Sequence, residues 1–188
     1  RIGVEHPLQE IDIRELPREP KQADLDALLA PLVAGESAGL MAEAGAPAVA
    51  DPGALLVRAA HARNIHVAPL VGPSSLLLAL MASGLNGQNF AFHGYLPMRE
   101  PERSKRITEL ERESRREERT QIFIETPYRN ASLFSALMTY CRPDTLLCVA
   151  TELTTQRECI STMPVLAWRA CPPPSIEKKP TVFLLLAG

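Results

Sequence analysis

The stretch Gln121–Thr151, QIFIETPYRNASLFSALMTYCRPDTLLCVAT, contains the succession of segments that decides the fold. Gln121–Glu125 and Thr145–Thr151 are short apolar runs without the regular apolar–polar alternation of a half-exposed strand. Tyr128–Cys141, which lies between them, has the length and apolar spacing of a helix. A strand, a helix and a second strand in succession predict an α/β chain. Because the strands are apolar throughout, we expect a largely parallel or mixed sheet that is covered on both faces.

The same alternation continues on both sides of this stretch. Strands are expected over residues 9–16, 38–42, 65–70, 90–96, 158–162 and 181–187. Helices are expected over residues 21–34, from Asp51-Pro52 onward, and over residues 76–83, 99–119 and 163–169. Asp51 is a good N-cap residue and Pro52 suits the first helical position. Gly35 and Gly84 follow apolar helical patterns and indicate where two of these helices end.

The composition is that of a globular protein. Of 188 residues, 46% are hydrophobic and 22% are charged, which excludes a disordered chain, a collagen-like repeat and a disulfide scaffold. No apolar run reaches the roughly 18 residues that span a bilayer, so no membrane association is expected. Lys plus Arg number 20 and Asp plus Glu number 22, which gives a formal net charge of −2. This balance provides no global attraction for nucleic acid, although it is compatible with a local basic patch.

The four cysteines and four histidines show no metal-ligand spacing. There is no CxxC pair, and the histidines have no ligand spacing with one another or with cysteine. No metal site is therefore expected. Cysteines that are widely spaced in apolar surroundings are typical of small buried side chains in a reducing compartment, so we expect a cytoplasmic protein.

The connection at Pro69–Pro73 predicts a domain boundary. We expect an N-terminal α/β domain over residues 1–70 and a C-terminal α/β domain over residues 71–188. The chain opens at Arg1 rather than at Met, which favours an N-terminus that has been truncated or cleaved.

Three loops that follow apolar runs are the candidate ligand sites, because open α/β sheets bind ligands at the carboxyl ends of their strands. They are residues 43–47, 71–75 and 125–129. Glycine in the first two loops lets a ligand approach the backbone closely. Ser74 and Ser75 begin a helix, where N–H groups and the helix dipole favour a carboxylate or phosphate. The same loops could be tight turns with capping residues only.

The sequences of these loops resemble motifs of the tetrapyrrole methylase superfamily. Met41–Gly53 resembles its S-D-A-G-T-P-x-I-S-D-P-G stretch, with Glu43 and Ala46 in place of Asp and Thr. The resemblance within the superfamily is to the branch that methylates a cytidine 2′-hydroxyl of small-subunit ribosomal RNA. The other matching stretches, in the same order, are Pro69–Ser75, Ala82–Leu85, Phe92–Pro97, Glu125–Arg129 and Glu152–Thr154.

This resemblance implies two small α/β domains with S-adenosylmethionine (SAM) in a cleft between them, a homodimer and no metal. The family's first strand, with its Gly-rich loop, is absent from the chain. The implied cofactor-binding residues are Glu43, Ala44, Gly45, Ala46, Pro47, Gly72, Pro73, Ser74 and Ser75. The implied substrate-side residues are Tyr95, Tyr128, Arg129 and Thr154. Glu125 and Glu152 are the candidate catalytic carboxylates, although either could instead bind ribose hydroxyls or pair with Arg129.

The resulting hypothesis is a SAM-dependent methyltransferase that acts on a ribose 2′-hydroxyl of ribosomal RNA, with the RNA or the small ribosomal subunit as partner. A methyltransferase for a small molecule of the tetrapyrrole type is one alternative. A non-catalytic SAM-binding relative is the other, because Thr151 and Thr155 stand where the RNA-methylating branch has Arg and Lys.

Overall fold

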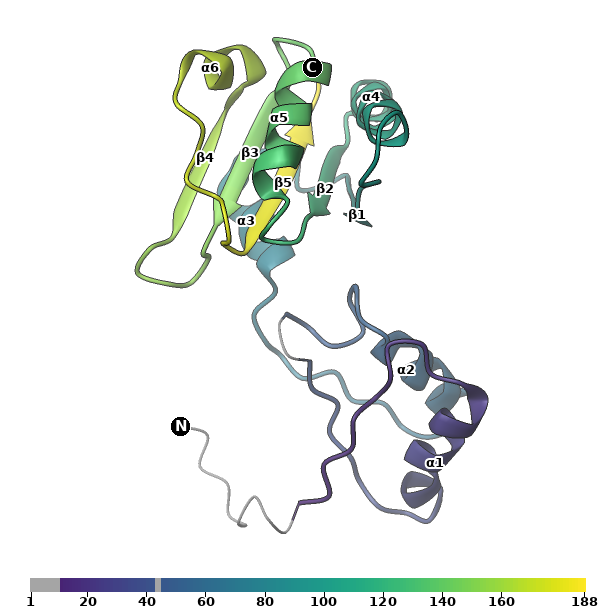
Figure 1. Cartoon of the computed structure of the whole chain (residues 1–188). Coiled ribbons are helices and arrows are strands. Elements are labelled where there is room, and N and C mark those ends of the chain that lie inside the picture. Colours follow the sequence, from purple (N-terminus) through teal and green to yellow (C-terminus); the bar gives the residue numbers. More distant parts are fainter. Residues whose placement is uncertain (1–10, 43–44) are drawn as a thin grey trace. The chain divides into compact units, whose positions relative to one another are not determined.

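The computed structural model describes residues 11–42 and 45–188. Contacts divide the chain into two compact units, unit 1 over Arg1–Pro73 and unit 2 over Ser74–Gly188 (Figure 1). Unit 2 holds all the strands of the described residues, and unit 1 holds two helices. The candidate catalytic residues therefore belong to unit 2.

Unit 2 is built on a mixed sheet of five strands. These are β1 (Phe90–Tyr95), β2 (Thr120–Ile124), β3 (Leu146–Thr151), β4 (Cys159–Pro164) and β5 (Thr181–Leu186), in the spatial order β1-β2-β5-β3-β4. β1 and β2 are parallel, whereas β5 is antiparallel to both β2 and β3. β2 and β3 therefore run in the same direction on either side of β5, and β4 lies antiparallel at the edge. The predicted mixed sheet is confirmed.

Helices cover both faces of this sheet. They are α3 (Ser75–Ser83), α4 (Glu102–Glu117), α5 (Asn130–Tyr140) and α6 (Val165–Ala170). α4, α5 and α6 pack on one face, above the rings of Phe123 and Phe183, which stack with their centroids 6.0 Å apart. α3 covers the other face through Ala79 and Leu80. Figure 1 shows α5 in front of the sheet and α3 behind it.

Local sequence explains why these elements form where the pattern predicts them. β5 lies in the middle of the sheet, so its largely apolar sequence TVFLLL is buried on both faces. α3 ends at Gly84, which has a left-handed backbone (φ 69°). Residues with a Cβ adopt this conformation less readily than glycine. α4 is strongly charged, yet Ile107, Leu110 and Ser114 form a buried stripe at helical spacing.

Unit 1 contains α1 (Gln22–Val33) and α2 (Gly53–His61). The N-cap residue of α2 is Pro52 rather than the predicted Asp51, whose Oδ1 accepts the N–H groups of Ala48 at 3.0 Å and Gly53 at 2.8 Å. Both helices lie where the sequence predicts them.

The strands predicted over residues 38–42, 65–70 and the described part of 9–16 are wrong. These segments carry no strand pairing. Large apolar side chains in them lie on the surface, since Met41 is 83% exposed and Leu70 is 91% exposed. An apolar run supplies the side chains of a strand, but a strand also needs a neighbour that accepts and donates backbone hydrogen bonds. The α/β pattern of unit 2 therefore does not extend to the described part of unit 1.

Candidate active site at the ends of strands β2 and β3

The two candidate catalytic carboxylates lie at one edge of the sheet in unit 2. Glu125 follows β2 directly, and Glu152 follows β3 directly. Ile124 of β2 and Ala150 of β3 both pair with Val182 of β5, so the two strands end close to the same level. With neighbouring strands roughly 4.8 Å apart, the two ends are separated by about 10 Å. Both glutamates are thus at strand ends, as the sequence predicts, and their catalytic role stays a prediction.

Glu125 is buried and is held by the residues that follow it. Its side chain is 5% exposed, and its Oε1 accepts hydrogen bonds from the Thr126 N–H at 2.6 Å and from Nη2 of Arg129 at 2.6 Å. The hydrogen bond to Glu125 is the main reason that the pKa of Arg129 is raised. The pairing with Arg129, one of the alternatives left open by the sequence, is therefore present. Both hydrogen bonds fall on Oε1, and none of the described residues donates a hydrogen bond to Oε2.

Glu152 has a different environment and does not pair with Arg129. Its side chain is 8% exposed, with Oε1 lying 3.2 Å from Nε of Arg157 and Oε2 lying 3.3 Å from Nζ of Lys179. The contact with Lys179 is an ion pair without the geometry of a hydrogen bond. The backbone of Glu152 is left-handed (φ 50°), and its N–H donates to the carbonyl of Pro180 at 3.0 Å. These contacts connect the loop after β3 to the segment that precedes β5.

Asn130 ties the segment before β5 to the loop after β2. Asn130 is fully buried, and its Nδ2 donates to the carbonyls of Ile176 at 3.2 Å and Lys179 at 2.7 Å. The N–H of Lys178 also donates to the carbonyl of Pro127 at 3.0 Å. Asn130 could not be recognised from the sequence, because its partners lie 46 and 49 residues further along the chain. An asparagine at the start of a helix gives no local signal for such contacts.

The predicted substrate-side residues are on the surface of unit 2. Tyr95 is 55% exposed and Tyr128 is 79% exposed. Tyr95 ends β1 and pairs with Ile124, so it lies beside the strand that leads to Glu125. Thr154 is exposed in the loop after β3, where its N–H donates to Oε2 of Glu158 at 2.7 Å. The structure thus gathers Tyr95, Tyr128 and Arg129 near Glu125, whereas Thr154 belongs to the loop of Glu152.

The predicted cofactor-binding residues are divided between the two units. Glu43 and Ala44 lie outside the described residues. Gly45 is exposed with a left-handed backbone (φ 75°), and Ala46 and Pro47 are half-buried beside it. The others are Gly72 and Pro73, which are exposed at the end of unit 1, and Ser74 and Ser75, at the start of α3 in unit 2.

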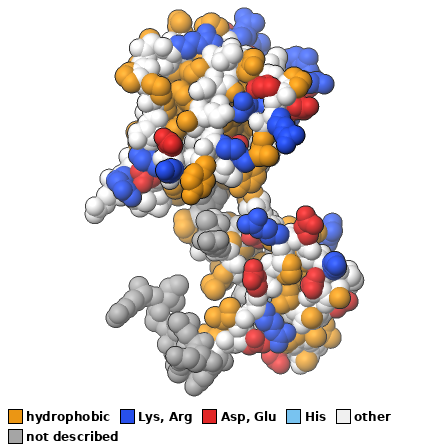
Figure 2. Space-filling view, viewed as in Figure 1, with side chains coloured by type: hydrophobic (Ala, Val, Ile, Leu, Met, Phe, Trp, Pro, Cys, Tyr) orange, Lys and Arg blue, Asp and Glu red, His pale blue; other side chains and the backbone are white. Residues whose placement is uncertain are grey.

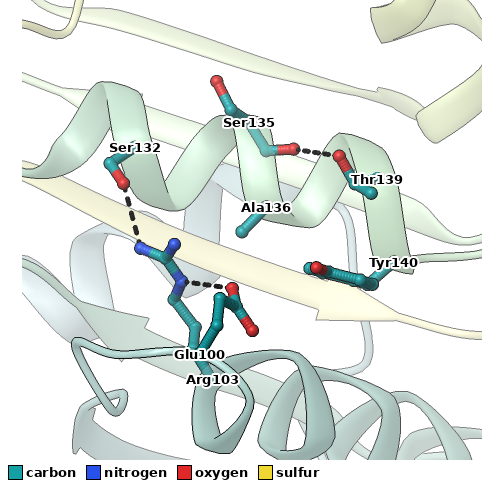
Figure 3. Close-up of a pocket in the computed structure, with 7 residues that line it drawn as sticks. All are labelled: Glu100, Arg103, Ser132, Ser135, Ala136, Thr139 and Tyr140. Carbon is teal, nitrogen blue, oxygen red and sulfur yellow. Dashed lines mark hydrogen bonds and ion pairs between the residues drawn. The ribbon is translucent and has the colours of Figure 1, made fainter.

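A shallow groove of about 290 Å³ lies between the start of α4 and the outer face of α5 (Figure 3). In it, Nη1 of Arg103 donates to Oγ of Ser132 at 2.9 Å, and Nε of Arg103 donates to Glu100 at 3.0 Å. The remaining lining residues are Ser135, Ala136, Thr139 and Tyr140. The groove contains none of the predicted site residues.

Two kinds of feature are missing from the described part of the chain. Residues 11–42 and 45–188 contain no group of three or more His, Cys, Asp and Glu side chains that could hold a metal ion. Within the same ranges, no helix combines the length and the apolar character needed to cross a membrane.

Curated relatives named ribosomal RNA small subunit methyltransferase I match most of the chain. The relative from Xylella fastidiosa (strain Temecula1) is 38% identical over 153 residues, which are 81% of this chain and 53% of that protein. The relative from Vibrio cholerae is 32% identical over 171 residues, which are 89% of this chain and 57% of that protein. The chain therefore spans about half the length of the curated relatives it matches. No family model matches the chain.

Solved methyltransferases share the fold. CobJ superposes with a TM-score of 0.57 at 20% identity, over 96% of this chain and 80% of that one. A uroporphyrin-III C-methyltransferase from Thermus thermophilus, in complex with S-adenosyl homocysteine, superposes with a TM-score of 0.50 at 16% identity, over 88% of this chain and 73% of that one. At such identities the likeness concerns the fold alone, and the predicted α/β fold of the tetrapyrrole methylases is confirmed. The chain is thus similar in sequence to curated ribosomal RNA small subunit methyltransferases I, and it shares the fold of these solved methyltransferases.

Proposed function

We propose that this chain is part of a SAM-dependent methyltransferase that acts on a ribose 2′-hydroxyl of small-subunit ribosomal RNA. The observation that carries the proposal is the 38% identity, over 81% of the chain, to a relative named ribosomal RNA small subunit methyltransferase I. The choice of a cytidine 2′-hydroxyl follows from the resemblance of the loops. With ribosomal RNA as the acceptor, we also propose a cytoplasmic location, and the same resemblance supports a homodimer.

SAM is the proposed cofactor, and the loops named for it suit its chemistry. The Ser74 hydroxyl makes no capping hydrogen bond, and the first N–H groups of α3 have no acceptor within the helix, so these donors fit a carboxylate. A Cβ at Gly45 or at Gly72 would meet no atom within 4 Å, so each glycine leaves open space along its backbone. The solved relative in fold that holds S-adenosyl homocysteine supports this choice.

The chain's own residues would orient the acceptor and take up its proton. SAM supplies a methyl group that is already activated on a sulfonium, so the protein's main contribution is orientation and a dry site. Glu125 would accept the proton of the hydroxyl nucleophile at Oε2, because its Oε1 is engaged by Thr126 and Arg129. Glu152 would keep the neighbouring loop in place, since both its oxygens face cations.

Transfer of label distinguishes this proposal from the two alternatives. The full-length protein would be incubated with tritiated SAM and small ribosomal subunits from a strain that lacks the modification. Label in a ribose of the RNA would support the proposal, and label only in a pigment fraction would favour the small-molecule enzyme.

The non-catalytic alternative has its own outcome. It predicts SAM binding by calorimetry without label in any fraction. In the structure Thr151 is buried and the Thr155 hydroxyl donates to the carbonyl of Glu152 at 2.8 Å, so both threonines serve the loop after β3. The intact mass of the natural protein would show whether residues precede Arg1 in the form to be assayed.

A further inference from the structure

Four side chains, one at the end of β1 and three in the loops after β1 and β2, form a partly exposed surface that we call the tyrosine–arginine patch. They are Tyr95, Met98, Tyr128 and Arg129. Met98 is 56% exposed, and both tyrosines are more than half exposed. Nη1 of Arg129 contacts Sδ of Met98, which joins the two loops. Tyr128 precedes Arg129 in the chain, and Tyr95 lies close enough to contribute to the raised pKa of Arg129, after the larger effect of Glu125.

The patch presents its two tyrosine rings to solvent, beside the half-buried guanidinium of Arg129. The rings of Phe123 and Phe183 in the same unit are completely buried, so the core of this unit is large enough to bury aromatic side chains. Exposed tyrosine and arginine are typical of binding surfaces, since a ring or a guanidinium plane contributes contact area at little cost in conformational entropy. Both planes can stack on a nucleobase.

The charges around the patch argue against a partner recognised mainly by its phosphates. Arg129 is paired with the buried Glu125 at 2.6 Å. Arg103, which donates to Ser132 in α5, is paired with Glu100 at 3.0 Å. On the face shown in Figure 2, positive and negative side chains are interspersed over unit 2. A duplex or an anionic membrane surface requires a field of one sign. Unpaired bases offer their faces and edges instead, and these suit rings and a fixed guanidinium.

We propose that the tyrosine–arginine patch binds unpaired nucleotides of RNA by stacking, with Arg129 held in orientation by Glu125. The inference rests on the proposed function for the choice of RNA as the ligand. Because Arg129 is bonded directly to Glu125, a nucleotide on the patch lies beside the carboxylate that would take up the acceptor proton.

Binding to a short, fluorescein-labelled, cytidine-containing ribo-oligonucleotide tests the patch. Fluorescence anisotropy would be measured on the full-length protein with SAM present, for the single strand and for its duplex. Tyr128→Ala and Tyr95→Ala should each weaken binding of the single strand about 10- to 100-fold, as expected when a stacked base is lost. Tyr128→Phe keeps the ring and should retain the affinity. Tyr140→Ala is the matched control, because Tyr140 is 40% exposed on the same unit but outside the patch.

The dependence on salt and strandedness gives the contrary outcomes. The patch predicts preference for the single strand and a shallow salt dependence, corresponding to release of about two counterions or fewer. Equal affinity for the duplex, no detectable binding of the single strand, or full binding by both alanine variants would overturn the inference. A Tyr128→Ala variant that changes only the oligomeric state in analytical ultracentrifugation would also overturn it and identify the patch as a protein interface.

Failure of the inference can be told apart from failure of the proposed function. If ribosomal RNA is methylated but the tyrosine variants leave both KM and kcat unchanged, the proposed binding of nucleotides by the patch is wrong and the proposed function stands. If the oligonucleotide binds in a tyrosine-dependent way while no RNA is methylated, the patch stands and the function is wrong.

Discussion

The loop after β2 and the loop after β3 begin with the same residue type at the same edge of one sheet, yet their contacts differ. Glu125 pairs with an arginine four residues further on, beside exposed tyrosines. Glu152 has a left-handed backbone and lies between Arg157 and Lys179, the second of which belongs to the segment before β5. The first glutamate has local partners and an open surface, whereas the second joins distant segments. We infer that the loop after β2 carries the chemistry and that the loop after β3 supports it.

The largest expected effect is the loss of turnover in Glu125→Gln. We expect turnover to fall about 10²-fold, the effect typical of removing a positioned acid or base, because glutamine keeps the shape but cannot take up the proton. Affinity for SAM should be largely kept. Initial rates with tritiated SAM and undermethylated small subunits measure the first quantity, and calorimetry measures the second. A similar loss of turnover in Glu152→Gln would contradict the division of roles between the loops.

Asn130→Ala should lower the free energy of unfolding by about 2 kcal/mol, because the carbonyls of Ile176 and Lys179 lose their donor. Urea unfolding of the full chain measures this change. Ser135→Ala, on the exposed face of the same helix, is the control and should stay close to the unchanged protein. An Asn130→Ala variant of full stability would show that the segment before β5 is held by other contacts.

Buried thiols report whether the Asn130→Ala variant loosens the core of unit 2. Burial raises the pKa of the Cys141 thiol to about 12, and Cys148 is also buried with a raised pKa. At neutral pH we expect labelling of the exposed Cys159 and Cys171 only, and labelling of Cys141 and Cys148 only after the core opens. Peptide mapping by mass spectrometry gives the order. Early labelling of Cys141 in the unchanged protein would contradict a closed core.

Glu152→Gln should have a smaller effect on stability than Asn130→Ala, about 1 kcal/mol, because it removes a charge that faces two cations while leaving the backbone contacts in place. Turnover of the folded enzyme should stay within a few-fold of the unchanged protein. Thermal unfolding and initial rates, measured on the same preparation, separate the two effects. Loss of turnover without loss of stability would assign Glu152 to the chemistry after all.

Arg157→Ala should have the smallest effect, within about 0.5 kcal/mol of the unchanged free energy of unfolding. Its side chain is 81% exposed, and exposed ion pairs contribute little. Lys179→Ala should cost more, since Lys179 is 33% exposed and lies in the segment that Asn130 also holds. Urea unfolding of the two variants gives the comparison. An equal loss in both would indicate that the two cations share the anchoring of Glu152.

Much of unit 2 could be predicted from the sequence, because its signals are local. Gly84 ends α3, and the apolar runs at β2, β3 and β5 form adjacent strands of the sheet. The same kind of run at residues 38–42 and 65–70 predicts strands that the described residues do not form. The difference is pairing, which the side chains of a single run cannot specify.

The amino-acid sequence alone determined the order of helices and strands in unit 2, the strand-end positions of Glu125 and Glu152, and the resemblance to a methyltransferase family. Only the tertiary structure decided which partners each glutamate contacts. Because β5 lies between β2 and β3, Lys179, which precedes β5, comes next to Glu152. Asn130, at the start of α5, then donates to the backbone carbonyl of the same lysine. Partners so distant in the chain meet only when the sheet assembles, so no local pattern distinguishes the anchoring glutamate from the one beside the open surface.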